Sequence, residues 1–125
     1  MDEPVRIVDN GDGTLEVSLY GDIDFGNSPS VRETIRDALG RSTPTGIRVD
    51  LGAVTFLDSS GIAVLVVVHR LASSTGAAYG VVNASPAVYE HLRLTGLAEL
   101  FGVTRPGENP DSTGRSRGAV PPAEQ

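Results

Sequence analysis

The 125-residue sequence contains no cysteine and no lysine, and its two histidines, His69 and His91, stand far apart. Without cysteine, a disulfide framework and a thiolate metal site are excluded, and two isolated histidines on helix surfaces do not form a metal centre. All ten basic residues are arginines, and sixteen acidic residues outnumber them, so the net charge is −6. Such a chain repels a phosphate backbone, and no basic cluster offsets this repulsion, so we predict no nucleic-acid partner.

The sequence also lacks an apolar run of 18 residues, the length that a membrane-spanning helix requires. Its acidic start, Met1-Asp2-Glu3, does not have the positive charge of a signal peptide. We therefore predict a cytoplasmic protein with no membrane association. The length and the hydrophobic fraction of 39% suit one globular domain.

The composition changes after residue 105. Residues 106–125 contain four prolines and three glycines, and Val120 is their one large apolar side chain. Such a segment cannot bury enough apolar surface to offset the entropy lost on ordering. We therefore predict one domain over residues 1–105 and a disordered C-terminal tail over residues 106–125.

Alternating apolar residues predict strands in the folded part, and apolar stripes behind capping residues predict helices. A capping box of Ser30 and Glu33 is expected in the first helix, and Gly40 is expected to end it. This pattern predicts an α/β fold with a mixed sheet flanked by helices, in the order ββαβαβαβ. The elements are strands 5–8 and 15–19, helix 28–40, strand 47–51, helix 59–73, strand 79–82, helix 85–96 and strand 100–103.

Two segments have a second interpretation. The β-branched run 64–68 has the propensity of a buried strand, whereas residues 59–73 have the length and the capping residues of a helix, which we favour. Residues 9–14 have the glycines of a hairpin turn and also resemble a calcium loop. Gly11 occupies a ligand position of that loop and its final acid is missing, so we favour the hairpin and predict no metal.

The stretch Val54-Thr55-Phe56-Leu57-Asp58-Ser59-Ser60-Gly61-Ile62 resembles the central signature of STAS domains, specifically of bacterial anti-sigma-factor antagonists. Gly21-Asp22-Ile23-Asp24 is similar to the other marked turn of that family. Ser85-Pro86-Ala87-Val88 and Thr95-Gly96-Leu97 are similar to its last helix and exit. The resemblance covers residues 5–103 and implies a single STAS-like domain with a helix after Asp58.

The resemblance implies a regulatory protein that catalyses no reaction and needs no cofactor. An unphosphorylated antagonist of this family binds an anti-sigma factor and so releases a sigma factor. The anti-sigma factor is commonly also an ATP-dependent serine kinase, which phosphorylates the first serine of the motif, here Ser59. A metal-dependent serine phosphatase removes the phosphate. The partners implied are thus an anti-sigma factor with serine kinase activity and a serine phosphatase.

Physical chemistry supports a switch at Ser59. A helix N-terminus favours an anion, so the fold tolerates a phosphate there, whereas a partner meets added negative charge. We predict partner contacts from the residues around this serine, which are Asp22, Asp24, Phe25, Asp58, Ser60, Gly61 and Ile62. Phe25 begins the run Phe25-Gly26-Asn27-Ser28-Pro29, which departs from the common family form.

Plainer roles stay open for the same residues. Asp58, Ser59 and Ser60 also suit a helix cap, Asp22 and Asp24 also suit a solvated turn, and Gly61 also suits close packing.

Two other functions are weighed against this one. A serine hydrolase needs the motif G-x-S-x-G, but Leu57 stands two positions before Ser59. It also needs an oriented base, and neither histidine lies near a plausible catalytic partner in the sequence. A STAS scaffold of a stress-signalling assembly, or an accessory subunit of a transport complex, has the same fold and stays open. The sequence contains no glycine-rich phosphate-binding loop that would indicate a nucleotide site.

Overall fold

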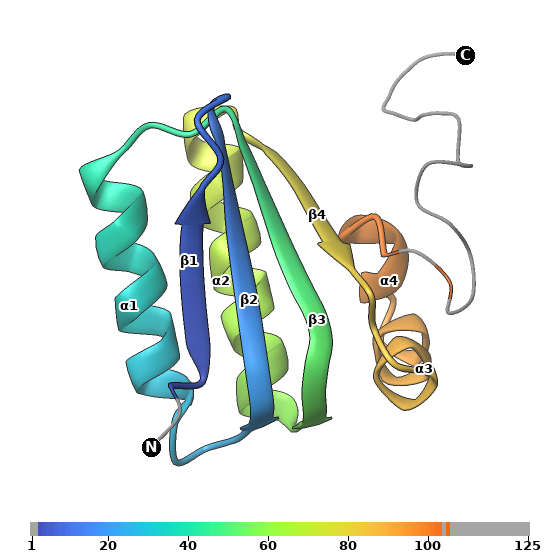
Figure 1. Ribbon diagram of the computed structural model, residues 1–125. Helices are drawn as coiled ribbons and strands as arrows, with labels where there is room; N and C mark the ends of the chain where they lie inside the picture. Colours follow the sequence, from blue (N-terminus) through green and yellow to red (C-terminus); the bar gives the residue numbers. More distant parts are fainter. Residues whose placement is uncertain (1–2, 104, 106–125) are drawn as a thin grey trace, which may run out of the picture.

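The computed structural model describes residues 3–103 and 105, and the predicted tail at 106–125 lies outside this part. Two strands open the described chain, helices and strands then alternate, and two short helices follow (Figure 1). In chain order they are β1 (Val5–Asp9), β2 (Thr14–Ile23), α1 (Ser28–Arg41), β3 (Gly46–Leu57), α2 (Ser59–Thr75), β4 (Ala78–Val82), α3 (Pro86–Leu94) and α4 (Leu97–Leu100).

The four strands form one mixed sheet in the order β1-β2-β3-β4. β1 is antiparallel to β2, whereas β2, β3 and β4 are parallel to one another. The predicted hairpin turn is confirmed, and it uses Gly11 and Gly13 at φ values of 82° and 95°, a conformation that favours glycine. Because β2 and β3 are parallel, the loop after β2 and the start of α2 meet at one end of the sheet (Figure 1).

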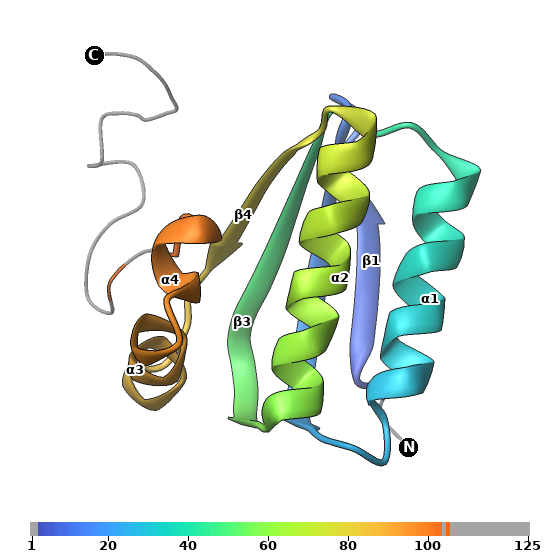
Figure 2. The same cartoon turned by 180° about the vertical axis from the view of Figure 1, so that it is seen from behind.

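Helices α1 and α2 cover one face of the sheet, and α3 and α4 lie beside β4 (Figure 2). The β-branched run that also suited a strand belongs to α2, as predicted. Val64, Leu65 and Val68 of this helix are fully buried in the core. Burial of each such side chain contributes about 1.5–3 kcal/mol, so packing against the sheet outweighs the strand propensity of valine.

The α/β fold class with a mixed sheet and flanking helices is confirmed, but the last predicted strand is wrong. Leu100 ends α4, and Phe101 and Gly102 form a turn. The Phe101 ring is completely buried, and its carbonyl oxygen accepts a hydrogen bond from the Val81 N–H at 3.1 Å. The segment therefore makes one backbone hydrogen bond to the edge of β4. Burial of the Phe101 ring holds it there in place of the predicted strand pairing.

The predicted start of α1 at Ser28 is confirmed, but the predicted capping box and the predicted end at Gly40 are wrong. The N-cap is Asn27, whose side chain makes no capping hydrogen bond, and the helix continues past Gly40 to Arg41. The capping box does not form because Ser30 lies inside the helix, and the Glu33 carboxylate pairs with Arg36 at 3.3 Å. The predicted cap at Ser85 is confirmed, since its Oγ accepts a hydrogen bond from the Val88 N–H at 3.2 Å.

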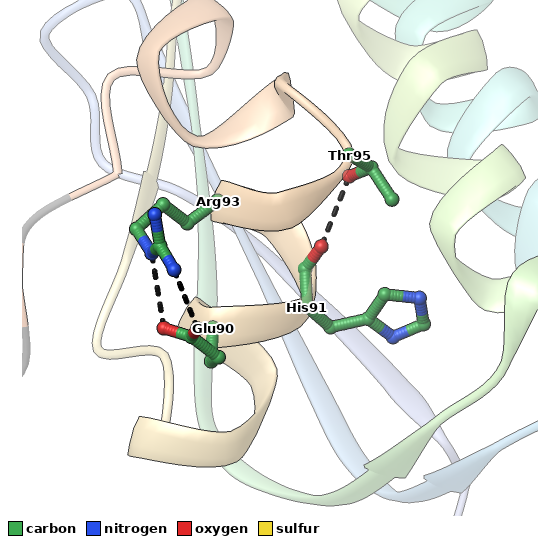
Figure 3. A network of polar contacts seen from close by, with 4 residues as sticks. All are labelled: Glu90, His91, Arg93 and Thr95. Carbon is green, nitrogen blue, oxygen red and sulfur yellow. Dashed lines mark hydrogen bonds and ion pairs between the residues drawn. The ribbon is translucent and has the colours of Figure 1, made fainter.

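The end of α3 carries a polar network on its exposed side (Figure 3). Arg93 donates to both carboxylate oxygens of Glu90 at 3.0 and 2.6 Å, and this pairing holds the pKa of Glu90 below its usual range. The Thr95 hydroxyl donates to the carbonyl oxygen of His91 at 3.0 Å. Both charged groups are half exposed, so this pair contributes little to stability.

One histidine departs from its predicted surface position. His91 is exposed on α3, as predicted, whereas His69 of α2 is half-buried. The His69 ring lies 5.3 Å from the Tyr79 ring and 5.8 Å from the Phe101 ring, measured between centroids. His69 therefore belongs to an aromatic cluster that joins α2 to β4 and to the turn after α4.

Candidate functional site

Ser59 is the first residue of α2, and it lies where β2 and β3 end. Its side chain is exposed, and its hydroxyl makes no hydrogen bond to any described residue. A free hydroxyl at a helix N-terminus is open to a modifying enzyme, and the positive end of the helix dipole suits an added anion. The predicted exposure of Ser59 is thus present in the structure.

Asp58 is the N-cap of α2. Its Oδ1 accepts hydrogen bonds from the Ser60 N–H at 2.8 Å, the Ser60 hydroxyl at 2.5 Å and the Gly61 N–H at 3.0 Å. Its Oδ2 accepts a fourth hydrogen bond from the Phe25 N–H at 3.1 Å. These bonds, led by that from the Ser60 side chain, lower the pKa of Asp58, so its carboxylate is charged beside Ser59.

The capping network separates the roles of the two serines. The Ser60 hydroxyl is bonded to Asp58 and the residue is half-buried, whereas Ser59 is exposed and unbonded. Only Ser59 therefore presents a free hydroxyl on this turn.

The end of β2 and the loop after it lie against the start of α2. Their acidic residues, Asp22 on the strand and Asp24 in the loop, are both held by hydrogen bonds. Asp22 Oδ1 accepts from the Thr55 hydroxyl at 2.6 Å. Asp24 Oδ1 accepts from the Gly26 N–H at 2.9 Å and from the Asn27 N–H at 3.3 Å. Asp22 is exposed and Asp24 is half-buried, so the end of β2 and the loop present negative charge in a fixed arrangement.

Asn27 organises this loop, and the sequence interpretation assigned it no role. Its Oδ1 accepts from the Asp24 N–H at 2.9 Å, and its Nδ2 donates to the Asp22 carbonyl oxygen at 2.8 Å. Asparagine commonly bonds nearby backbone in this way, and its place just before Ser28-Pro29 was the available signal. Because its side chain serves the loop, it does not cap α1.

Two phenylalanine rings are exposed at this end of the protein. Phe25 is 84% exposed in the loop, as its selection as a partner residue requires, and Phe56 is 53% exposed near the end of β3. Phe56 was missed, because the sequence showed it only as part of an apolar stretch. Asp22 pairs with Phe56 in the strand register.

Gly61 and Ile62 were predicted as partner contacts, but both are buried in the structure. A Cβ atom on Gly61 would lie 2.6 Å from Leu57 Cδ1 and 2.9 Å from the Ile23 carbonyl oxygen. Ile62 belongs to the core, with 8% of its surface exposed. Gly61 therefore allows α2 to approach the strand ends, and neither residue is available to contact a partner.

The described residues contain no group of three or more histidine, aspartate or glutamate side chains arranged to hold a metal ion. Within residues 3–103 and 105, no helix is long and apolar enough to cross a membrane. The arrangement at Ser59 thus consists of an exposed hydroxyl, a charged cap, two further acids and two exposed rings.

The family model of the STAS domain matches residues 6–109. This chain belongs to the STAS domain family. The anti-sigma F factor antagonist of Paenibacillus polymyxa is 30% identical to it over 91 residues, which are 73% of this chain and 78% of that protein. The resemblance inferred from the Asp58-Ser59-Ser60-Gly61 stretch is thereby confirmed.

Solved structures share the fold of this STAS domain. The anti-sigma factor antagonist SpoIIAA in its unphosphorylated form gives a TM-score of 0.73 at 21% identity, over 94% of this chain and 99% of that chain. A sulfate transporter family protein from Wolinella succinogenes gives a TM-score of 0.63 at 19% identity, over 74% and 76% of the two chains. At these identities the likeness concerns the fold, which antagonists share with a protein of a transporter family.

Proposed function

We propose that this STAS protein is a cytoplasmic anti-sigma-factor antagonist that is switched by phosphorylation of Ser59. The unphosphorylated form binds an anti-sigma factor that is also a serine kinase, and phosphorylation releases it. A serine phosphatase restores the binding form. The name of the Paenibacillus polymyxa relative supports this role. The observation that carries the proposal is the free, exposed hydroxyl of Ser59 beside the charged Asp58.

The modification is a phosphoryl transfer from ATP. A bond forms between Ser59 Oγ and the γ-phosphorus, and the bond between that phosphorus and the oxygen shared with the β-phosphate breaks. The hydroxyl proton is lost and ADP leaves. The antagonist supplies only the acceptor hydroxyl, and the kinase supplies the catalytic groups, so the antagonist itself is not an enzyme.

Added charge explains how the switch acts without refolding the domain. A phosphate brings about −1.5 to −2 charges to a turn where Asp58 is already ionised. A partner carboxylate about 6 Å away is then disfavoured by roughly 1–3 kcal/mol at an intermediate effective dielectric constant. Since 1.4 kcal/mol is about a factor of ten, one such contact weakens binding roughly ten- to a hundredfold.

The direct test is phosphorylation by an anti-sigma-factor kinase of the source organism. Mass spectrometry after incubation with kinase and ATP is expected to find one phosphate on Ser59 in the wild type and in Ser60→Ala, and none in Ser59→Ala. Ser60→Ala is the matched control because it changes the neighbouring hydroxyl of the same turn. Phosphate on Ser60 with Ser59 unmodified would refute the assignment.

Binding gives the second test of the switch. In calorimetry with the same kinase, Ser59→Ala is expected to bind as the wild type does, and Ser59→Glu at least about tenfold more weakly. Equal affinities for the two variants would mean that charge at position 59 does not control the complex.

A scaffold subunit of a stress-signalling assembly, or an accessory subunit of a transport complex, is the second candidate. Its support is the fold shared with a protein of the sulfate transporter family. Affinity capture from the source organism separates the two. Recovery of transport subunits, with no anti-sigma-factor kinase, would favour this candidate.

A further inference from the structure

The exposed aromatic rings extend the surface around Ser59 onto a second face of the protein. Ile23 and Leu57 pair in the strand register, and both side chains are buried at the start of α2. Successive side chains of a strand point to opposite faces, so Asp22 and Phe56, the preceding pair, project to the face away from α1 and α2. Asp22 and Phe56 are both exposed there.

Phe25 lies next to Asp24 in the loop between β2 and α1. Its N–H is bonded to Asp58, and its ring is 84% exposed. The chain has three phenylalanines, and the third, Phe101, is completely buried. Two of the three phenylalanines are thus exposed at the end of the protein that carries Ser59. Packing in the core does not explain why these two positions hold large apolar rings.

We propose that Phe25 and Phe56 form an aromatic anchor that inserts into an apolar surface of the anti-sigma factor bordered by basic side chains. This inference rests on the proposed function and adds to it the chemistry of the partner. Asp22 lies beside Phe56 and Asp24 beside Phe25, so a matching surface carries arginine or lysine around its apolar centre. The net charge of −6 favours the approach of such a surface over long range.

The anchor is preorganised. The loop hydrogen bonds of Asp24 and Asn27 and the bond from Phe25 to Asp58 fix the backbone beneath the first ring. Phe56 is fixed by the pairing of β3 with β2. Little backbone freedom is lost on binding, so the apolar area of the rings adds to affinity with a small entropic cost.

The anchor has a different physical signature from the switch. Burial of an uncharged ring depends little on salt, whereas attraction between Asp22 and a basic side chain weakens as salt screens it. A ring variant should therefore lower the affinity and leave its salt dependence unchanged. Asp22→Asn should lower the affinity and also reduce its salt dependence.

The test measures binding of Phe25→Ser and Phe56→Ser to the purified anti-sigma-factor kinase at two salt concentrations. Each variant is expected to bind about 10- to 100-fold more weakly, with wild-type salt dependence. Leu94→Ser is the matched control, because Leu94 is an exposed apolar residue at 69% on α3 and is expected to leave binding unchanged. Phe25 is 84% exposed, so Phe25→Ser should unfold at the wild-type midpoint. Phe56 is 53% exposed on a strand, so Phe56→Ser should unfold at a lower midpoint, and its binding is measured well below that midpoint, where the variant is folded.

The outcomes separate this inference from the proposed function. If the kinase binds and phosphorylates the wild type, but the ring variants bind as tightly, the anchor is refuted and the proposed function stands. Equal losses in Leu94→Ser would also overturn the anchor, since apolar exposure anywhere would then suffice. If no anti-sigma-factor kinase binds the wild type, both fail together.

Discussion

The carboxylate of Asp58 accepts a hydrogen bond from the Phe25 N–H at 3.1 Å, although 33 positions separate the two residues in the chain. Its other oxygen caps the first turn of α2. One side chain therefore ties the loop that carries an exposed ring to the turn that carries Ser59. Loss of this carboxylate would therefore remove hydrogen bonds from both places at once.

Asp58→Asn separates the two functions of this side chain. The amide oxygen of asparagine can still accept from the turn of α2, but its NH₂ group cannot accept from the Phe25 N–H. We expect the Phe25 amide to exchange with deuterium about tenfold faster, with the Ser60 and Gly61 amides still protected. Asp58→Ala should expose all three amides. Unchanged exchange at Phe25 in both variants would show that Asp58 does not hold the loop.

The pH dependence of stability offers a second test of Asp58. Hydrogen bonds to its carboxylate, led by that from Ser60, lower its pKa in the folded protein. Folding then favours the ionised form, so this contribution is present above the pKa of the unfolded chain and is lost as the pH falls through the lowered value. The melting-temperature difference between wild type and Asp58→Asn should shrink from about pH 7 to about pH 3. A constant difference would contradict this origin.

Gly61→Ala tests the close approach of α2 to the strand ends. Alanine favours a helix over glycine by about 1 kcal/mol, but its Cβ would lie 2.6 Å from Leu57 Cδ1 and 2.9 Å from the Ile23 carbonyl oxygen. The clash should dominate, and urea unfolding should show a loss of about 1–3 kcal/mol. Gly40→Ala in α1 is the control. Its Cβ meets nothing within 4 Å, so stability should rise by up to about 1 kcal/mol.

Local signals explain which parts of the fold the sequence could predict. The glycines of residues 9–14 predicted the hairpin, Ser85 predicted the start of α3, and Asp58 predicted that of α2. The central helix needed the family resemblance as well, because its apolar residues lie on every side. The last element was wrong because the end of the described chain is shaped by burial of Phe101 against α2 and β4, a contact between distant segments.

Prediction of the candidate site was limited in the same way, because part of it depends on contacts between distant segments. Ser59 and its acidic neighbours could be predicted from a contiguous motif, but exposure of Phe56 could not. The register between β2 and β3 shifts between Gly21 and Asp22, so Thr55 is an extra residue on β3. This bulge changes which side chains after it face the core. Likewise, the role of Asn27 depends on where the loop folds, and burial of Gly61 depends on the distance between α2 and the strands.

Asn27→Ala is expected to loosen the loop and leave the core intact. It removes the acceptor of the Asp24 N–H and the donor to the Asp22 carbonyl oxygen, at 2.9 and 2.8 Å. Each lost bond costs about 0.5–1.5 kcal/mol of local stability. Faster exchange of the Asp24 amide, with unchanged exchange in the centre of α2, is the expected pattern. Global loss of protection would instead assign Asn27 to the core of the fold.

The hydroxyl of Tyr79 joins β4 to α2 by donating to the Leu65 carbonyl oxygen at 2.9 Å. Burial raises the pKa of Tyr79, so the hydroxyl stays protonated and remains a donor. Tyr79→Phe keeps the ring against His69 and Phe101 and should lower the unfolding free energy by about 1 kcal/mol. Tyr89→Phe is the control, because its hydroxyl makes no hydrogen bond to the described residues. Equal unfolding midpoints for the two variants would mean that the bond from Tyr79 to Leu65 adds nothing to the attachment of α2.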